Sequence, residues 1–176
     1  MIKYCAFLRG VNVKGTNMKM ADVCKVFADA GMTNVSSVLA SGNIIFSSDK
    51  TESDLKPILE KAMSDYFNYE AFLFVKDRND VENFWNSNPF QKNEDFHIYA
   101  FVCNENFEST LMSEFQNSSK AENEEAKIEN GFFYWQVPKG NTLDSTFGKI
   151  LGKKSMKDQF TSRSLNTFEK VIKKMT

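Results

Sequence analysis

The order of strands and helices that the sequence predicts indicates an α+β fold, with antiparallel sheets packed by helices. Three observations lead to this prediction. Short, nearly continuous apolar runs that are typical of buried strands alternate along the chain with segments that have the 3.6-residue repeat of helices. Hairpin signals occur at Ser41-Gly42-Asn43 and at Asn130-Gly131. The second half of the chain repeats the element order of the first.

The first half predicts six elements before a short helix. They are a strand at Ile2–Leu8, a helix from Met20 that stops at Gly31, strands at Val35–Leu39 and Asn43–Ser47, a helix at Thr51–Phe67 and a strand at Ala71–Val75. Thr16 or Asn17 is expected to cap the first helix. Pro57 conflicts with the second helix, which must start near Ser53 or bend. The order β-α-β-β-α-β indicates a ferredoxin-like unit.

The second half predicts a similar series. A short helix at Asp77–Asn86 precedes a strand at Phe96–Cys103, a helix at Glu105–Gln116, strands at Ala126–Glu129 and Phe132–Val137, a helix capped by Asn141 or Thr142 that carries Leu143, an extended piece near Phe160, and a helix at Leu165–Met175. The fold predicted is therefore two ferredoxin-like α/β subdomains, residues 1–77 and 78–176, the second with an extra C-terminal helix. The repeat is one of element order and not of residues.

Composition limits the class of protein. The 176 residues are 41% hydrophobic, which is enough for a full core, and the net charge of −1 argues against a strongly basic nucleic-acid binder. The three cysteines lack metal-type spacing and predict buried thiols in a reducing compartment. No signal peptide or membrane-spanning run is recognisable, so we expect a cytoplasmic protein that does not enter a membrane.

The stretch from Leu8 to Met20 is the main candidate site. It joins a strand to a helix N-terminus, a junction that presents N–H groups and a positive dipole end to an anion. The side-chain donors within it are Arg9, Asn12, Lys14 and Asn17. The spacing of its glycines is that of a phosphate-binding P-loop, but no Lys-Ser/Thr pair follows the second glycine, which excludes a nucleoside-triphosphate site of that kind. A simple tight turn is the alternative interpretation.

Arginine is rare in this chain and marks a second candidate segment. Only Arg9, Arg78 and Arg163 are arginines among 22 basic residues, and arginine offers carboxylate or phosphate a planar fork that lysine lacks. Arg163 is expected at the start of the last helix, among hydroxyl side chains that include Thr167. An internal salt bridge that holds the two subdomains together is the alternative for Arg163.

Charge is distributed unevenly. Residues 149–174 hold eight basic and two acidic side chains, whereas residues 104–130 hold seven glutamates and two lysines. This asymmetry could steer an anionic partner, although such runs are more often solvated faces. Tyr134 and Trp135 could stack on RNA bases, but no RNP1-type motif accompanies them and core packing is favoured.

Several chemistries have no support in the sequence. His97 is the only histidine and lies within a predicted strand, where a packed or exposed face residue is the usual role. No cysteine, histidine or EF-hand spacing predicts a metal site. We therefore assign no metal, no cofactor and no catalytic residue, and leave open whether the protein is an enzyme.

Four segments together resemble a known family. LRGVNV at Leu8–Val13, SGNIIF at Ser41–Phe46, NPF at Asn88–Phe90 and TSRSLNT at Thr161–Thr167 are similar in order and spacing to the bacterial family catalogued as domain of unknown function 1697. The resemblance implies two ferredoxin-like subdomains in a cytoplasmic protein, and no established activity. The last segment departs from the family pattern, because Ser-Leu replaces an Asn-Trp pair.

In a ferredoxin-like unit the first and third strands pair antiparallel, so Arg9 and Asn12 are expected to gather with Ser41 and Asn43. The predicted ligand-binding set is therefore Arg9, Asn12, Lys14, Asn17, Ser41, Asn43, Arg163 and Thr167. The first hypothesis is a protein that binds a phosphate- or carboxylate-bearing small molecule, or nucleic acid, at the loop after the first strand. The alternatives are an enzyme of a small anionic substrate and a non-catalytic structural or interaction protein.

Overall fold

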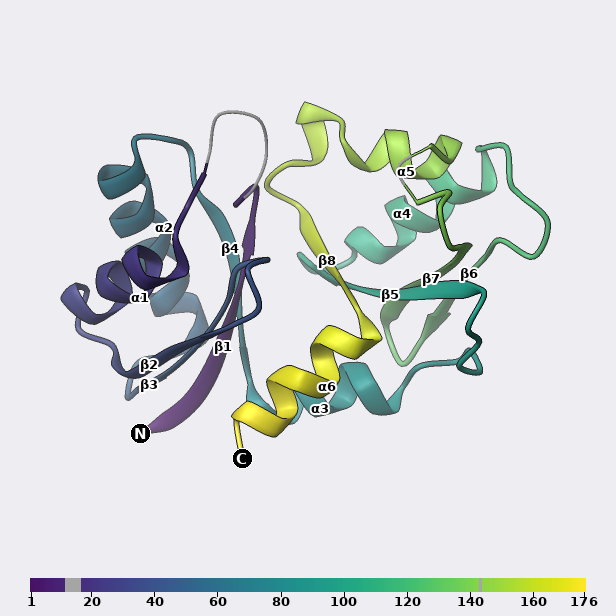
Figure 1. Cartoon of the computed structure of the whole chain (residues 1–176). Coiled ribbons are helices and arrows are strands. Elements are labelled where there is room, and N and C mark those ends of the chain that lie inside the picture. The colour runs from purple at the N-terminus through teal and green to yellow at the C-terminus, as the bar shows by residue number, and fades with distance from the viewer. Residues whose placement is uncertain (12–16, 143) are drawn as a thin grey trace. The chain divides into compact units, whose positions relative to one another are not determined.

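The computed structural model describes residues 1–11, 17–142 and 144–176. Its elements are β1 (Ile2–Arg9), α1 (Met20–Asp29), β2 (Thr33–Val38), β3 (Asn43–Ser48), α2 (Glu52–Phe67), β4 (Phe72–Asp77), α3 (Arg78–Asn86), β5 (Phe96–Cys103), α4 (Phe107–Gln116), β6 (Glu125–Glu129), β7 (Phe132–Pro138), α5 (Thr146–Leu151), the 3₁₀ turn Lys154–Met156, β8 (Phe160–Ser164) and α6 (Leu165–Lys174) (Figure 1). The predicted α+β class, with two antiparallel sheets packed by helices, is confirmed.

The chain divides into two compact units. Unit 1 comprises Met1–Glu82 together with Thr167–Thr176, and unit 2 comprises Asn83–Asn166. The sequence placed the division at 77/78 and assigned the whole C-terminal helix to the second part. In the structure the last ten residues join unit 1, because the ring of Phe168 packs on that of Phe7 with centroids 5.4 Å apart.

Unit 1 contains a four-stranded sheet of order β2-β3-β1-β4, with antiparallel pairing throughout. Alternation along β1 sends Tyr4, Ala6 and Leu8 into the core beneath α1 and α2, on one face of the sheet (Figure 1). Cys5 and Phe7 lie on the opposite face and are also fully buried. The continuous apolar run at the start of the sequence is therefore a central strand that is covered on both faces.

The helices of unit 1 follow their sequence signals with two differences. Thr51 caps α2 by accepting a hydrogen bond from the Asp54 N–H at 3.3 Å, and Pro57 lies inside the helix, where it removes one backbone donor. The predicted cap of α1 was wrong. Lys19 occupies the N-cap position without a side-chain cap bond, while Thr16 lies outside the described residues.

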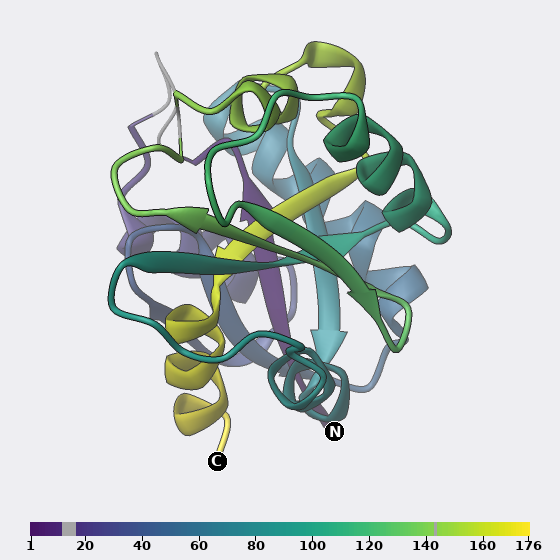
Figure 2. The same cartoon turned by 90° about the vertical axis from the view of Figure 1, so that its right-hand side faces the viewer.

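Unit 2 repeats the strand arrangement of unit 1, with the order β6-β7-β5-β8 (Figure 2). The extended piece expected near Phe160 is the edge strand β8, which completes this sheet. Its helix-covered face is a cluster of aromatic rings around Phe147, which contacts the rings of Phe101, Phe133 and Trp135. Ser145, and not Asn141 or Thr142, caps α5 by accepting from the Gly148 N–H at 2.9 Å. Leu143, expected in this helix, lies outside the described residues.

Two tyrosines with buried hydroxyl groups differ in whether those hydroxyls have a hydrogen-bond partner. Tyr134 donates to the Phe84 carbonyl at 2.7 Å, whereas the buried hydroxyl of Tyr69 has no hydrogen-bond partner within the described part of the chain. Burial, followed by the nearby charge of Glu60, raises the pKa of Tyr69 to about 12. An unsatisfied buried hydroxyl destabilises the folded state, and a satisfied one does not.

We expect Tyr69→Phe to raise the free energy of unfolding by up to about 1 kcal/mol, and Tyr134→Phe to lower it by about 1 kcal/mol. Urea unfolding at pH 7 measures both. The advantage of Tyr69→Phe should grow above pH 10, because the unfolded chain then releases the Tyr69 proton while the folded state, with its pKa near 12, retains it. Equal losses in the two variants would contradict this account.

Candidate functional site

The end of β1 meets the turn between β2 and β3, and we call this region the β1 corner (Arg9, Gly10, Val11 and residues 39–43). The Leu8 N–H donates to the Gly42 carbonyl at 2.8 Å, and Phe7 pairs with Asn43 in the ladder. Arg9 is the last residue of β1 and is partly buried. The structure thus places Arg9 and the turn at the same end of the sheet of unit 1.

Gly42 allows this close approach. A Cβ at this position would lie 2.6 Å from Cγ2 of Val11 and 2.9 Å from Cβ of Leu8, and its φ is +84°. Both distances are too short for real side chains, and a positive φ favours glycine. The turn can lie against the end of β1 only because residue 42 lacks a side chain.

Asn43 is fully buried, and its amide closes the turn from within. Its Nδ2 donates to the Val38 carbonyl and to the Ser41 hydroxyl, each at 2.9 Å. These bonds use both amide protons inside the hairpin, so they fix the shape of the corner. Ser41 itself is exposed, as is Asn17 farther along the chain. Asn12 and Lys14 lie outside the described residues.

Arg163 and Thr167 are arranged differently from the prediction. Arg163 lies in β8 opposite Ala100, and not in the last helix, because the Thr161–Ser164 segment pairs with β5. It is 8% exposed, and its Nη1 donates to the Thr161 hydroxyl and to the Ser162 carbonyl, each at 2.8 Å. Thr167 is buried within α6. Arg163 belongs to unit 2, whereas Thr167 and Arg9 belong to unit 1.

Unit 2 contains a pocket of about 540 Å³ beside the start of β5. Its lining comes from the end of α3, from residues 92–94 and 96–98, from Lys139 after β7 and from residues 164–166, where β8 passes into α6. Asn88 of the NPF segment and Ser164 of the TSRSLNT segment both line this pocket. Two of the segments that suggested a family therefore meet in unit 2, and the other two meet at the β1 corner.

Comparison with family models decides the membership. The model described as protein of unknown function (DUF1697) matches residues 1–134, which is most of the chain. The chain belongs to the DUF1697 family. A search among curated proteins returned no match.

A solved structure resembles that of this DUF1697 protein along its whole length. The conserved bacterial protein SP0830 from Streptococcus pneumoniae is 20% identical in sequence, and the match covers 99% of each chain with a TM-score of 0.78. At this identity the likeness establishes the fold alone. No helix within the described residues of the DUF1697 chain has the length and apolar character needed to cross a bilayer.

The pocket of unit 2 has no recognisable signal in the sequence. Asn88 and Ser164 were recognised only as parts of family segments, and His97 only as a strand residue. Nothing in the local pattern around Lys92 or Lys139 distinguishes them from other surface lysines, because they come together only when β5 and β7 pair.

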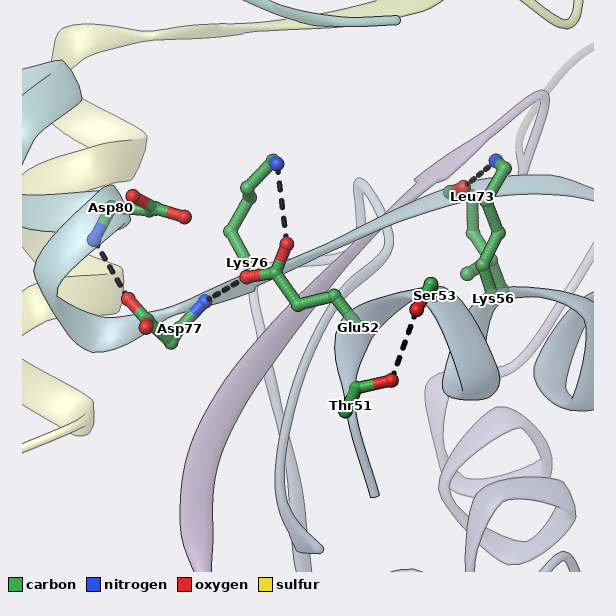
Figure 3. Close-up of polar contacts among 8 residues, drawn as sticks. All are labelled: Thr51, Glu52, Ser53, Lys56, Leu73, Lys76, Asp77 and Asp80. Atoms are coloured by element: carbon green, nitrogen blue, oxygen red, sulfur yellow. Dashed lines mark hydrogen bonds and ion pairs between the residues drawn. The ribbon is translucent and has the colours of Figure 1, made fainter. Parts of the chain in front are cut away.

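Three partly buried carboxylates of unit 1, those of Glu52, Asp77 and Asp80, lie close enough together to suggest a metal centre, with oxygens within 4.8 Å of one another (Figure 3). Glu52 accepts from the Asp77 N–H at 3.0 Å and pairs with Nζ of Lys76 at 3.4 Å, while Asp77 accepts from the Asp80 N–H at 2.9 Å. The two carboxylate oxygens of Glu52 are thus already engaged, one by the ammonium group of Lys76 and the other by a backbone N–H. The cluster joins the start of α2 to the junction where β4 passes directly into α3.

Because the carboxylates of Glu52 and Asp77 are already engaged by a lysine and by backbone donors, we expect divalent cations to leave the stability of the DUF1697 protein unchanged. Thermal unfolding with a chelator, and then with about 1 mM CaCl₂ or MgCl₂, should give the same Tm, since bound metal would raise it by mass action. A rise of several degrees that disappears in Glu52→Gln would show instead that the cluster binds metal.

Gly42→Ala should destabilise the DUF1697 protein more than a matched control. Gly131 has a similar φ of +80°, but a Cβ there would meet nothing within 4 Å. We expect Gly131→Ala to cost about 1 kcal/mol through backbone strain, and Gly42→Ala about 1–3 kcal/mol more because of the clash with Val11 and Leu8. Urea denaturation measures the difference, and equal costs would argue against a tightly packed β1 corner.

Proposed function

We propose that this protein binds a small molecule that bears a phosphate or carboxylate group, and that the ligand lies at the β1 corner. The observation that carries the proposal is the Leu8–Gly42 hydrogen bond, which brings the arginine at the end of β1 to the same end of the sheet as the exposed Ser41. The proposed ligand-binding residues are those of the predicted set that belong to unit 1, namely Arg9, Asn12, Lys14, Asn17, Ser41, Asn43 and Thr167, whereas Arg163 belongs to unit 2.

These residues have different parts in the proposal. Arg9 supplies a fork of N–H donors that matches a carboxylate or phosphate in geometry and charge, and Ser41 supplies a hydroxyl. Asn43 fixes the turn that presents Ser41. The start of α1 adds backbone donors, because its N-cap residue Lys19 makes no side-chain cap bond.

Two alternatives receive less support. For Arg163 and Asn43, the hydrogen bonds within their own hairpin or strand favour a structural role, as in the hypothesis of a non-catalytic protein. The net charge of −1 favours a small ligand over nucleic acid.

We further propose that both units are ferredoxin-like, since each has the order β-α-β-β-α-β. We also propose that the protein is cytoplasmic.

A thermal-shift screen of nucleotides, sugar phosphates, inorganic phosphate and short RNA tests the proposal. A ligand at a hundred times its Kd should add about 2.7 kcal/mol and raise Tm by several degrees. Arg9→Lys should weaken the best ligand about tenfold and roughly halve that gain, because lysine cannot form the two parallel hydrogen bonds of the arginine fork. Arg78→Lys is the matched control, since Arg78 lies on α3 and pairs with Glu82.

The proposal fails if no anion raises Tm, or if Arg9→Lys and Arg78→Lys retain the same shift. A steep loss of binding with added salt, seen for RNA but not for small anions, would point to nucleic acid as the ligand.

A further inference from the structure

The pocket of unit 2 has a backbone frame that is held by hydrogen bonds. The Lys139 N–H donates to the Asp95 carbonyl at 2.9 Å, which fixes the segment before β5 to the end of β7. Ser164 pairs with Tyr99 on the other side of β5, so the first residues of α6 pass the start of that strand. Three strand ends thus define a cavity whose shape does not depend on a ligand.

One wall of the pocket is apolar and partly aromatic. Phe96 and Ile98 alternate onto one face of β5, and Trp85 reaches the pocket from the end of α3. Ile98 is buried, whereas Trp85 and Phe96 remain partly exposed. Partly exposed aromatic side chains around a cavity suit the flat face of a ring. His97 also lines the pocket, with its ring 5.8 Å from that of Tyr99, and the proposal gives it no separate role in recognition.

The rim of the pocket carries more positive than negative charge. Lys92 and Lys139 both line it and are exposed. Glu94 is the one acidic residue in the lining. Two ammonium groups against one carboxylate favour an anionic group on the ligand, and Ser164 and Asn166 add neutral hydrogen-bonding groups.

We propose that this pocket is a second binding site, for a small molecule that combines an aromatic ring with a phosphate or carboxylate. The ring lies against Trp85 and Phe96, and the anionic group is held by Lys92 and Lys139. The volume of about 540 Å³ is in the ordinary range for ligand pockets and accommodates a mononucleotide. The site lies wholly in unit 2 and is independent of the function proposed for the β1 corner.

Tryptophan fluorescence of the full chain gives a direct readout. The sequence has two tryptophans, and Trp135 is 2% exposed, with its Nε1 bound to Glu124 at 3.0 Å. A response to ligand should therefore come from Trp85 and disappear in Trp85→Phe. We expect adenosine monophosphate, phenyl phosphate or benzoate to give a saturable change, and adenosine or inorganic phosphate to bind at least about tenfold more weakly, because each offers only half of the recognised chemistry.

Charge variants test the rim. Lys92→Gln and Lys139→Gln should each weaken the best ring-bearing anion about three- to fivefold, as for exposed ion pairs, and Glu94→Gln should strengthen it. Lys154→Gln is the matched control, because Lys154 is also an exposed lysine of unit 2 but does not line the pocket. Binding by the phosphate ester but not by benzoate would identify a phosphate ligand within the proposed class, and the reverse result a carboxylate.

Backbone amide NMR shifts provide a measurement that does not depend on fluorescence. Residues 85–98, 139 and 164–166 should shift on titration, in wild type and in Arg9→Lys alike, which separates this site from the β1 corner. The inference is overturned if no ring-bearing anion gives a saturable response by either method up to about 10 mM. It is also overturned if inorganic phosphate binds as tightly as adenosine monophosphate, or if Lys154→Gln weakens binding as much as Lys139→Gln.

Discussion

Burial of a central strand on both faces is the constraint on which the rest of this structure depends. In unit 1, β1 pairs with β3 and β4, and its alternate side chains enter the core beneath α1 and α2. Its opposite face carries Phe7, which a four-stranded sheet with helices on one side leaves uncovered. Phe168 of α6 packs on that ring. A helix from the far end of the chain is therefore part of the first unit.

In unit 2 as well, a helix covers the second face of the sheet, but here that helix precedes the strands in the sequence. Tyr134 of β7 is fully buried, and its hydroxyl is bound by the carbonyl of Phe84 in α3, a helix that begins in unit 1. The ring of Phe84 also packs against that of Phe132, with centroids 4.2 Å apart. The helix α3 follows β4, the last strand of unit 1, and α6 follows β8, the last strand of unit 2. Each of these two helices begins in one unit and ends in the other. This exchange explains why a boundary drawn between strands, at residue 77, differs from the division in the structure.

The sequence predicted the parts of the fold that local periodicity encodes. The apolar run of β1, the stripe of α2 and the two hairpin turns are visible within short windows, because burial of one face repeats along one element. The edge strand β8 was harder to recognise, since Thr161–Ser164 is polar and becomes a strand through its ladder with β5. For the same reason Arg163 was expected in a helix.

The candidate site shows the same division between local and distant information. The meeting of Arg9 with the turn at Ser41 followed from antiparallel pairing alone, and the structure places both at one end of the sheet. The pocket of unit 2 could not be foreseen, because its lysines and aromatic side chains come from segments that no short window joins.

The assignment of Thr167–Thr176 to unit 1 has a consequence for synthesis on the ribosome. Unit 2 has all of its residues once Asn166 has been added, whereas unit 1 still lacks the helix that covers Phe7. Although domains usually mature from the N-terminus onward, here the part that begins first is completed last. Until α6 has been synthesised, the aromatic ring of Phe7 on β1 lacks its cover, and a chaperone could shield it.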